Sequence, residues 1–368
     1  MYPVMKSASR WNGYIFCGVL VLMMVYSIPK LLSFSKDEQE PLSLFLSGDL
    51  SRKFEGTFDQ QFPVRDASIS FWAGLKYLAF GEGESGVLIG REGWLFSNEE
   101  LLLPNRTEDV VADHVAKVSE YIDALQAKGK KVIVVPVPMK VTVYPEYYAS
   151  ELSPEYYSVN ENFLRGLNRE GIPHVNLYSE YINHKSVDDK LLYLKTDTHW
   201  SAHGAKIAAQ VVAQQYPELV MSREYRTQNG GRDQYQGDLT NFLLAPGPLL
   251  GDLKAPETID VYETSAVIDE SSASALFGET SDSLDLVGTS YSDIEQWNFR
   301  GFLQQDLARN VDSYSLKEKG PYAAMDEYLA SGVDQSTSEV VIWELPMRVL
   351  LKTDHRKATW QQTLQSQF

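Results

Sequence analysis

Short unbroken apolar runs mark the strands that this sequence predicts. Three runs rich in β-branched or large apolar residues lie at 131–138, 284–287 and 340–346, and such runs are typical of strands buried on both faces of a parallel sheet. A further apolar segment at 174–178 predicts a fourth strand. Because helical patterns separate these runs, the order of elements favours a parallel sheet covered by helices.

Apolar residues at helical spacing predict the covering helices. They recur at intervals of three and four residues over 110–128, where Gly129 is a typical helix terminator, and over 160–170. Ser201 is positioned to cap a third helix. Near the C-terminus, 322–330 predicts another short helix, and Ser292 with Glu295 has the spacing of a capping box ahead of a helix that follows the 284–287 strand.

The N-terminal segment predicts a membrane anchor. Residues 11–29 are almost uncharged and about long enough to cross the hydrocarbon core of a membrane as a helix. No small-x-small cleavage site follows, which favours an uncleaved signal anchor over a removed signal peptide. Lys6 and Arg10 precede the span, while Asp37, Glu38 and Glu40 follow it, so the bulk of the chain is expected outside the cytoplasm.

These patterns predict three parts. Residues 1–35 are expected to form a cytoplasmic tail and transmembrane signal anchor, and 36–85 a linker of short helices. Residues 86–368 are expected to form one catalytic domain that begins with a β-hairpin over 86–96. Within that domain, 217–283 is rich in glycine, proline and acidic residues and predicts an insertion of loops and a hairpin beside the active face.

Charge and cysteine content exclude some functions. The formal net charge of −17 argues against nucleic acid as a partner, because nucleic-acid binding needs a basic face. The only cysteine, Cys17, lies in the apolar N-terminal run, so the chain forms no intramolecular disulfide. No cofactor is expected.

The strongest candidate for chemistry is a pair of separated motifs. Asp197 and His199 are two residues apart, so in extended chain both side chains point to the same side, and the carboxylate accepts a hydrogen bond from the imidazole. Ser290 follows the 284–287 strand at a glycine turn, where a nucleophile is exposed at the carboxyl end of a strand. Together the three residues predict a Ser-His-Asp triad.

Other residues are candidates for binding. Trp200 and Lys140 are candidates for contact with substrate, because one adjoins the base and the other follows the carboxyl end of a predicted strand. Asn298 and Arg300 are candidates for stabilising an oxyanion, together with the backbone N–H of Ser290. Asp197, His199 and His203 could alternatively hold a cation, but no glutamate base follows the first histidine, and no metal is expected.

Several blocks resemble the alginate O-acetyltransferases of the AlgJ/AlgX type in sequence and order. They cover about Gly86 to Arg348 and are Gly93-Trp94-Leu95-Phe96, Pro138-x-Lys140, Tyr144-Pro145-Glu146, Thr196-Asp197-Thr198-His199-Trp200, Gly237-Asp238-Leu239, Gly288-Thr289-Ser290-Tyr291-Ser292 and Ile342-Trp343-Glu344-x-Pro346-x-Arg348. The resemblance implies an SGNH-hydrolase-like α/β domain with a permuted motif order, in which the Asp-x-His block precedes the serine block. It implies Ser290 as nucleophile, His199 as base and Asp197 as the residue that orients the base.

The resemblance also implies a function and a location. Such proteins acetylate exopolysaccharide hydroxyls in the bacterial periplasm and receive acetyl groups from a membrane-bound O-acyltransferase partner. The chain ends about twenty residues after Arg348, so it lacks the carbohydrate-binding module of AlgX-type members and is closer to the AlgJ type. Its acidic balance leaves the particular polymer open.

Two alternatives remain open on the sequence. A polysaccharide acetylesterase would use the same triad and let water open the acyl-serine, a difference that depends on water exclusion by the site. A non-catalytic polysaccharide-binding scaffold would carry a vestigial triad.

Overall fold

The computed structural model describes residues 10–37, 41–60, 62, 65–187, 189–267, 283–317 and 319–352. The chain divides into two compact units, Met1–Trp72 and Ala73–Phe368, and each is considered by itself. Lys6, Glu38, Glu40 and the C-terminal residues from 353 lie outside the described residues, as does part of the predicted insertion, 268–282. The predicted domain boundaries stay predictions.

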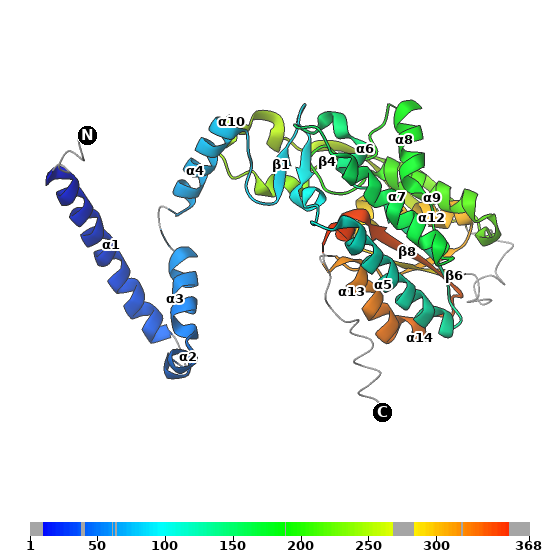
Figure 1. The fold of residues 1–368 in the computed structure, drawn as a ribbon, viewed down its shortest axis with the longest axis horizontal. Helices are drawn as coiled ribbons and strands as arrows, with labels where there is room; N and C mark the ends of the chain where they lie inside the picture. The colour runs from blue at the N-terminus through cyan, green and yellow to red at the C-terminus, as the bar shows by residue number, and fades with distance from the viewer. Residues whose placement is uncertain are drawn as a thin grey trace. The chain divides into compact units, whose positions relative to one another are not determined.

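The first unit consists of helices, as its sequence predicts. Its helices are α1 (Arg10–Asp37), α2 (Pro41–Ser47), α3 (Asp49–Gln60) and the start of α4 (Arg65–Phe80) (Figure 1). Aromatic side chains join α1 to α3, with ring centroids of Tyr26 and Phe58 5.8 Å apart. Within α1, Trp11–Phe34 is 24 residues long with a mean hydropathy of 2.1. Length and apolarity permit a membrane span, although signal sequences share both properties.

The second unit is built on a four-stranded parallel sheet in the order β3-β8-β6-β7. The bounds of these strands are β3 Lys131–Val137, β6 Ser283–Val287, β7 Asn310–Ser313 and β8 Val340–Pro346. Every pair in the sheet is parallel, which confirms the predicted α/β class and three of the predicted strands. Parallel pairing also brings the carboxyl ends of all four strands to one edge.

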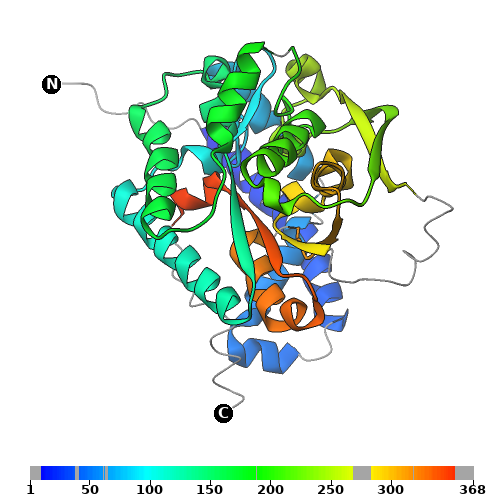
Figure 2. The same cartoon turned by 90° about the vertical axis from the view of Figure 1, so that its right-hand side faces the viewer.

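Helices cover both faces of this sheet (Figures 1 and 2). One face carries α8 (Leu177–Val187), α9 (Ala202–Gln215) and α12 (Phe299–Leu307), and the other carries α5 (Thr107–Ala127) and α13 (Gly320–Glu327). The other helices of this unit are α6 (Lys140–Val143), α7 (Pro154–Arg169), α10 (Gly247–Leu250), α11 (Ser290–Asp293) and α14 (Val333–Gln335). The predicted helices at 110–128, 160–170 and 322–330 are therefore confirmed, with shifted ends.

Two antiparallel hairpins complete the unit. Strands β1 (Val87–Ile89) and β2 (Leu95–Ser97) form the predicted N-terminal hairpin. Strands β4 (Tyr225–Tyr235) and β5 (Glu257–Ala266) form the hairpin within the predicted insertion.

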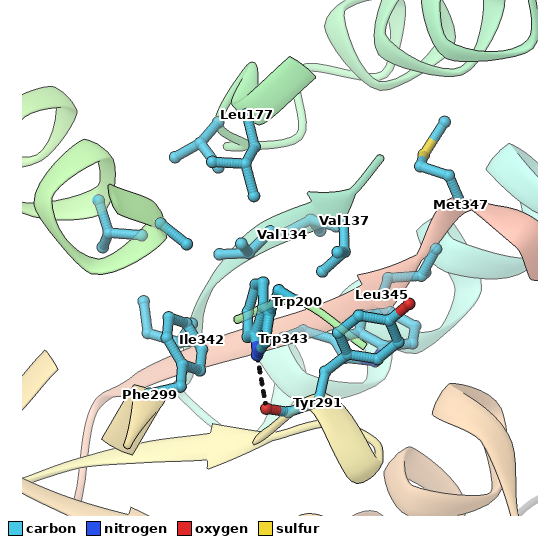
Figure 3. Close-up of a cluster of buried hydrophobic side chains, with 14 of the residues drawn as sticks. Val134, Val137, Leu177, Trp200, Tyr291, Phe299, Ile342, Trp343, Leu345 and Met347 are labelled. Atoms are coloured by element: carbon cyan, nitrogen blue, oxygen red, sulfur yellow. Dashed lines mark hydrogen bonds between the residues drawn. The ribbon is translucent and has the colours of Figure 1, made fainter. Parts of the chain in front are cut away.

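Large aromatic side chains fill the space between the sheet and its helices. Trp200 and Phe299 are fully or almost fully buried, and the ring centroid of Trp200 lies 4.8 Å from that of Phe299 and 5.3 Å from that of Tyr291 (Figure 3). Trp343 is fully buried against Tyr121 of α5 and Tyr322 of α13. The Trp200 indole N–H donates to the backbone carbonyl of Tyr291 at 3.1 Å, which satisfies its polar atom inside the core. This packing fixes the segment after His199 against the segment after Ser290.

Two predicted elements are wrong. Residues 174–178 do not form a strand: His174 makes a single parallel bridge to Val134, and α8 begins at Leu177. Ser292 and Glu295 do not form a capping box either. Thr289 caps α11 by accepting a hydrogen bond from the Tyr291 amide, whereas the Ser292 hydroxyl donates to Glu344.

We predict that Ser201→Ala destabilises the second unit by about 1–2 kcal/mol, because Ser201 caps α9 as the sequence indicated. Its hydroxyl oxygen accepts from the Gly204 amide at 3.2 Å and donates to the Leu191 carbonyl at 2.5 Å. Chemical denaturation of the full chain in detergent measures the loss. Ser158→Ala, at an exposed serine within α7, is the control, and equal stabilities for the two variants would contradict the capping role.

Candidate active site

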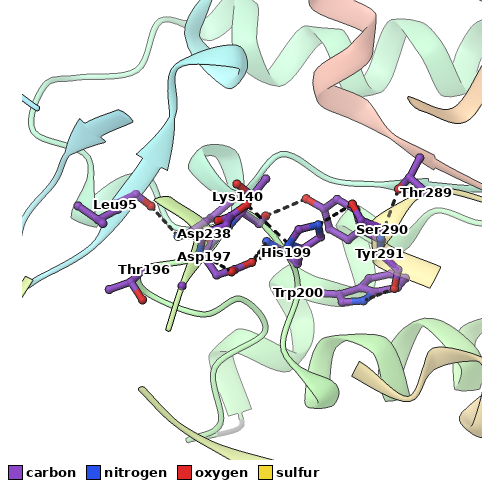
Figure 4. Close-up of polar contacts among 12 residues, drawn as sticks. Leu95, Lys140, Thr196, Asp197, His199, Trp200, Asp238, Thr289, Ser290 and Tyr291 are labelled. Carbon is purple, nitrogen blue, oxygen red and sulfur yellow. Dashed lines mark hydrogen bonds and ion pairs between the residues drawn. The ribbon is translucent and has the colours of Figure 1, made fainter. Parts of the chain in front are cut away.

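The site forms where the carboxyl ends of β3, β6 and β8 meet the loop that precedes α9. Ser290 stands three residues beyond the end of β6, at the first position of α11. His199 and Asp197 lie in the loop ahead of α9. The three residues come together at this edge of the sheet although 91 positions separate His199 from Ser290 (Figure 4).

Hydrogen bonds join these side chains in the predicted order. His199 Nε2 is 2.7 Å from Ser290 Oγ, and His199 Nδ1 is 2.7 Å from Asp197 Oδ1. Asp197 and His199 are buried, whereas Ser290 is partly exposed. The geometry is that of a Ser-His-Asp triad with its hydroxyl at the surface.

The electrostatics of Asp197 determine the tautomer of His199. Burial alone would raise the pKa of the Asp197 carboxyl, but hydrogen bonds from the His199 side chain and from the Asp238 and His199 amides hold that pKa below its usual range. An ionised carboxylate only accepts hydrogen bonds, so Nδ1 of His199 carries the proton. Nε2 is then an acceptor for the Ser290 hydroxyl proton.

Asp238 is a second carboxylate beside the triad, and its role was not inferred from the sequence. Its amide donates to Asp197 Oδ2 at 2.8 Å, and its Oδ1 accepts from the Thr198 amide at 2.7 Å. Its Oδ2 is 3.9 Å from His199 Nδ1. Burial and repulsion by Asp197 raise the pKa of the Asp238 carboxyl. The two aspartates thus brace one loop against the other through reciprocal backbone contacts.

Glu344 holds the turn that carries Ser290. It is fully buried within β8, two residues before the strand ends, and accepts from the Thr289 amide at 2.7 Å and from the Ser292 hydroxyl at 3.0 Å. A Cβ at Gly288 would lie 2.5 Å from Glu344 Oε2, so this position requires glycine. Burial raises the pKa of the Glu344 carboxyl, and these hydrogen bonds partly oppose that effect.

Tyr291 links the nucleophile turn to the loop of the base. Its hydroxyl donates to the Thr198 carbonyl at 2.8 Å and accepts from Arg348 at 2.8 Å. The Tyr291 ring meets the His199 ring edge-on with centroids 4.7 Å apart. His199 therefore has a wall of aromatic carbon on one side, which limits the orientations open to its ring.

The structure corrects the expectation that Lys140 and Trp200 contact substrate. Both side chains are fully buried. The Lys140 ammonium donates to the carbonyls of Leu95, Lys195 and Asp197 at 2.6, 2.9 and 2.9 Å. These contacts tie β2 to the loop that carries Asp197 and His199. Trp200 packs in the core against Tyr291 and Phe299.

Asn298 and Arg300 are placed away from the triad hydrogen bonds. Asn298 donates to the Thr264 hydroxyl at 3.0 Å, and Arg300 Nε donates to the Val311 carbonyl at 2.7 Å. Both residues line a cavity beside α11 and α12. Their expected role in stabilising an oxyanion stays a prediction.

The cation alternative involves different residues from those expected. Ligand atoms of Asp197, His199 and Asp238 lie within 4.8 Å of one another among the described residues, and His203 is not part of this group. The same atoms already bond to each other and to backbone amides. A cation bound to His199 Nδ1 would have to displace the proton that joins this nitrogen to Asp197.

Fold and site together define a class: an α/β protein with Ser-His-Asp geometry at the carboxyl edge of a parallel sheet. The family model of the SGNH hydrolase-like domain of the acetyltransferase AlgX matches residues 87–347. The chain is 33% identical over 349 residues to the probable alginate O-acetylase AlgJ of Pseudomonas putida, covering 92% of this chain and 89% of that protein. The Pseudomonas aeruginosa AlgJ is 32% identical, covering 91% and 88%.

Solved structures agree with these sequence matches. The O-acetyltransferase domain of Pseudomonas putida AlgJ superposes with a TM-score of 0.65 at 30% identity, covering 77% of this chain and 99% of that domain. AlgX of Pseudomonas aeruginosa has the same fold, with a TM-score of 0.55 at 20% identity over 74% of this chain and 68% of AlgX. The chain therefore belongs to the SGNH hydrolase-like O-acetyltransferases of the AlgJ/AlgX family, and it is closer to AlgJ.

We predict that Lys140→Met lowers the free energy of unfolding at neutral pH by about 3 kcal/mol or more, because buried carbonyl oxygens lose their donor. Chemical denaturation of the full chain measures this loss. Lys131→Met, at a lysine whose side chain is 46% exposed, is the control. A Lys140→Met variant as stable as the control would show that the ammonium does not hold the loop.

The Lys140 effect has a defined pH dependence. Burial lowers the pKa of the Lys140 ammonium to about 8, and nearby carboxylates oppose this only in part, while an unfolded lysine titrates near about 10.4. Between these values the unfolded chain binds more protons, so this group makes the free energy of unfolding rise with pH. The stability difference between wild type and Lys140→Met should therefore widen from pH 8 to about pH 10.4, and a narrowing difference would contradict the lowered pKa.

We predict that Asp238→Ala speeds amide hydrogen exchange in the loop that contains Asp197 and His199, because the Thr198 amide loses its acceptor. Asp238→Asn keeps a carbonyl oxygen at that position and should preserve most of the protection. Hydrogen-exchange mass spectrometry of peptides that cover residues 193–200 compares the two variants. Equal exchange in Asp238→Ala and wild type would mean that Asp238 does not brace the loop.

Proposed function

We propose that the chain transfers acetyl groups through an acetyl-serine intermediate onto hydroxyls of alginate or a related exopolysaccharide. Its AlgJ relatives are named as probable alginate O-acetylases, and the observation that carries the mechanism is the continuous contact of Ser290, His199 and Asp197 at 2.7 Å each. The proposal assigns Ser290 as nucleophile, His199 as general base and Asp197 as the residue that orients the base.

The proposed first step forms the acyl-enzyme. His199 Nε2 takes the proton from the Ser290 hydroxyl as Oγ attacks the acetyl carbonyl, and the leaving group then accepts that proton from the imidazolium. Asp197 stabilises the charge on the imidazolium, and Oδ2 of the Asp238 carboxyl lies 3.9 Å from Nδ1. The Ser290 amide, at the N-terminal position of α11, is a donor that a helix leaves available for an oxyanion.

The proposed second step regenerates the serine. A sugar hydroxyl loses its proton to His199 Nε2 as its oxygen attacks the acetyl-serine carbonyl. The imidazolium then returns that proton to the leaving Ser290 Oγ, and the acetyl group stays on the polymer. Water at the same position would instead give acetate, the reaction of an esterase. The two reactions differ only in the acceptor, so the acceptor must be tested directly.

We further propose that the acetyltransferase domain works in the periplasm, held to the inner membrane by α1. The apolar stretch Trp11–Phe34 supports an anchor by its length and composition. A membrane-bound acyltransferase that supplies acetyl groups would then need to meet Ser290 on the same side of the membrane.

We predict that Ser290→Ala abolishes acetyl-enzyme formation, by at least about a thousandfold, while the free energy of unfolding changes by less than about 1 kcal/mol. Intact-protein mass spectrometry after exposure to an activated acetyl ester reports the addition of one acetyl group. Ser331→Ala, at an exposed serine, is the matched control. Acetyl-enzyme in the Ser290→Ala variant would overturn the assignment of the nucleophile.

The fate of the acetyl group separates transferase from esterase. Acetylated wild type is mixed with an unacetylated oligouronate, and both the sugar and the released acetate are quantified. Acetyl on the sugar supports the proposal, whereas acetate alone identifies an esterase. Oligouronate binding by a wild type that never becomes acetylated would identify a scaffold.

A further inference from the structure

Trp297 is an aromatic neighbour of the base that the proposed mechanism does not use. It ends the short 3₁₀ helix Glu295–Trp297, seven residues after Ser290, and is fully buried. Its ring is close to parallel with the His199 ring, with planes 27° apart and centroids 6.2 Å apart. The indole N–H has no hydrogen-bond partner in the part of the chain that the structure describes. Packing of the ring therefore holds Trp297 beside the base.

Tyr235 supports Trp297 from a distant part of the chain. It is the last residue of β4, and its ring meets the Trp297 ring edge-on, with planes 70° apart and centroids 5.0 Å apart. Edge-to-face aromatic pairs at such distances are stabilising beyond the area that they bury. The three rings thus form a series of contacts, from Tyr235 through Trp297 to His199, that links the β4–β5 hairpin to the base.

The Tyr235 hydroxyl lies near the carboxylates beside the base. Burial raises the pKa of this hydroxyl, and the negative charges of Asp197 and Asp238 raise it further. The phenol is therefore neutral at physiological pH and keeps a proton to donate, whereas an ionised carboxylate only accepts. The ring of Tyr235 thus bears on the imidazole through Trp297, and its hydroxyl lies on the side of the orienting carboxylate.

Pairing within the hairpin fixes the place of Tyr235. Tyr235 is opposite Glu257 in the antiparallel register of β4 and β5, and Glu257 accepts from the Lys195 and Thr196 amides at 2.8 and 2.6 Å. Two residues after Tyr235, a Cβ at Gly237 would lie only 2.3 Å from the Thr196 carbonyl oxygen. This end of the hairpin is thus held closely against the loop that carries the base.

We propose that Tyr235 is a positioning residue for acyl transfer. Through Trp297 it keeps the His199 ring in line with Ser290. The proposal rests on the function proposed above and adds the β4–β5 hairpin to the parts of the chain on which the reaction depends. The imidazole has to direct Nε2 at the serine hydroxyl and then at the leaving group, so a small rotation of its ring misdirects the proton. Tyr291 limits this rotation by its edge-on contact at 4.7 Å, and Trp297 limits it at a second contact.

The test compares rates of acetyl-enzyme formation by intact-protein mass spectrometry, with the full chain in detergent and an activated acetyl ester at saturating concentration. Tyr235→Ala should lower the rate constant at least about tenfold, because it removes the ring that supports Trp297. The fraction of protein that is finally acetylated should stay at the wild-type level, and so should the ester concentration that gives half of the maximal rate. A loss of folded protein would instead reduce the acetylated fraction.

Two further variants are the controls. Tyr235→Phe keeps the ring and should recover most of the wild-type rate. Tyr262→Ala removes another half-buried tyrosine of the same hairpin, whose ring packs against Phe302 with centroids 5.5 Å apart, and it should react within about twofold of the wild-type rate. If Tyr235→Ala does not fold, Tyr235→Leu takes its place, because leucine keeps apolar volume but has no aromatic edge.

A wild-type rate constant in Tyr235→Ala would overturn the proposal, as would equal slowing in Tyr262→Ala. A smaller acetylated fraction at an unchanged rate constant would also overturn it, since that result indicates a structural role alone. Equal slowing in Tyr235→Phe and Tyr235→Ala would assign the effect to the hydroxyl and exclude the role through Trp297. Wild type that forms no acetyl-enzyme would overturn the proposed function and this proposal with it, so wild type alone distinguishes the two failures.

Discussion

The buried carboxylate of Asp197 is the constraint around which the rest of the site is arranged. A buried charge is tolerated only when hydrogen bonds replace the water it has lost. Asp197 obtains them from the His199 amide and side chain and from the Asp238 amide. Meeting that requirement forces the loop ahead of α9 and the segment after β4 into contact. The orientation of the imidazole follows from this contact.

The same arrangement, a carboxylate that accepts hydrogen bonds from backbone amides, recurs in the segments around the triad. Glu100 accepts from the Lys140 and Val141 amides, Glu257 from the Lys195 and Thr196 amides, and Glu344 from the Thr289 amide. In each case a carboxylate satisfies backbone donors that have no partner within a helix or strand, at the first turn of α6, in the loop ahead of α9 and at the cap of α11. These hydrogen bonds therefore hold the segments at the sheet edge in position. A triad needs this, because small displacements of its members reduce catalysis strongly.

Local patterns in the sequence predict the parts of the structure that depend on local physics. The runs that became β3, β6 and β8 are apolar on both faces because both faces are covered, and the Ser201 cap follows from backbone donors at a helix start. The pairing of Asp197 with His199 is also local. The sequence identifies Ser290 only as a serine that follows the end of a strand. Its contact with His199, at 2.7 Å, depends on the fold.

The errors come from contacts that sequence spacing does not encode. Residues 174–178 have a strand-like composition, but only His174 forms a bridge to β3, and α8 begins at Leu177. Ser292 has the spacing of a cap, but Glu344 from a distant strand takes its hydroxyl. Lys140 follows a strand end as a ligand-binding lysine would, yet three carbonyls from other segments enclose it. Asp238 and Glu344 lie inside the blocks that resemble the family, and that was the available signal for both.

The overall negative charge of the chain is compatible with an acidic polymer because charge acts locally in salt. At physiological ionic strength the screening length is about 8 Å, so acids spread over the surface of the domain contribute little inside a cavity. Several acids near the triad also have a structural role, because Asp197, Glu257 and Glu344 each accept hydrogen bonds from backbone amides. Net charge therefore governs solubility and the exclusion of nucleic acid, whereas the groups within a few ångströms of Ser290 govern what reaches the serine.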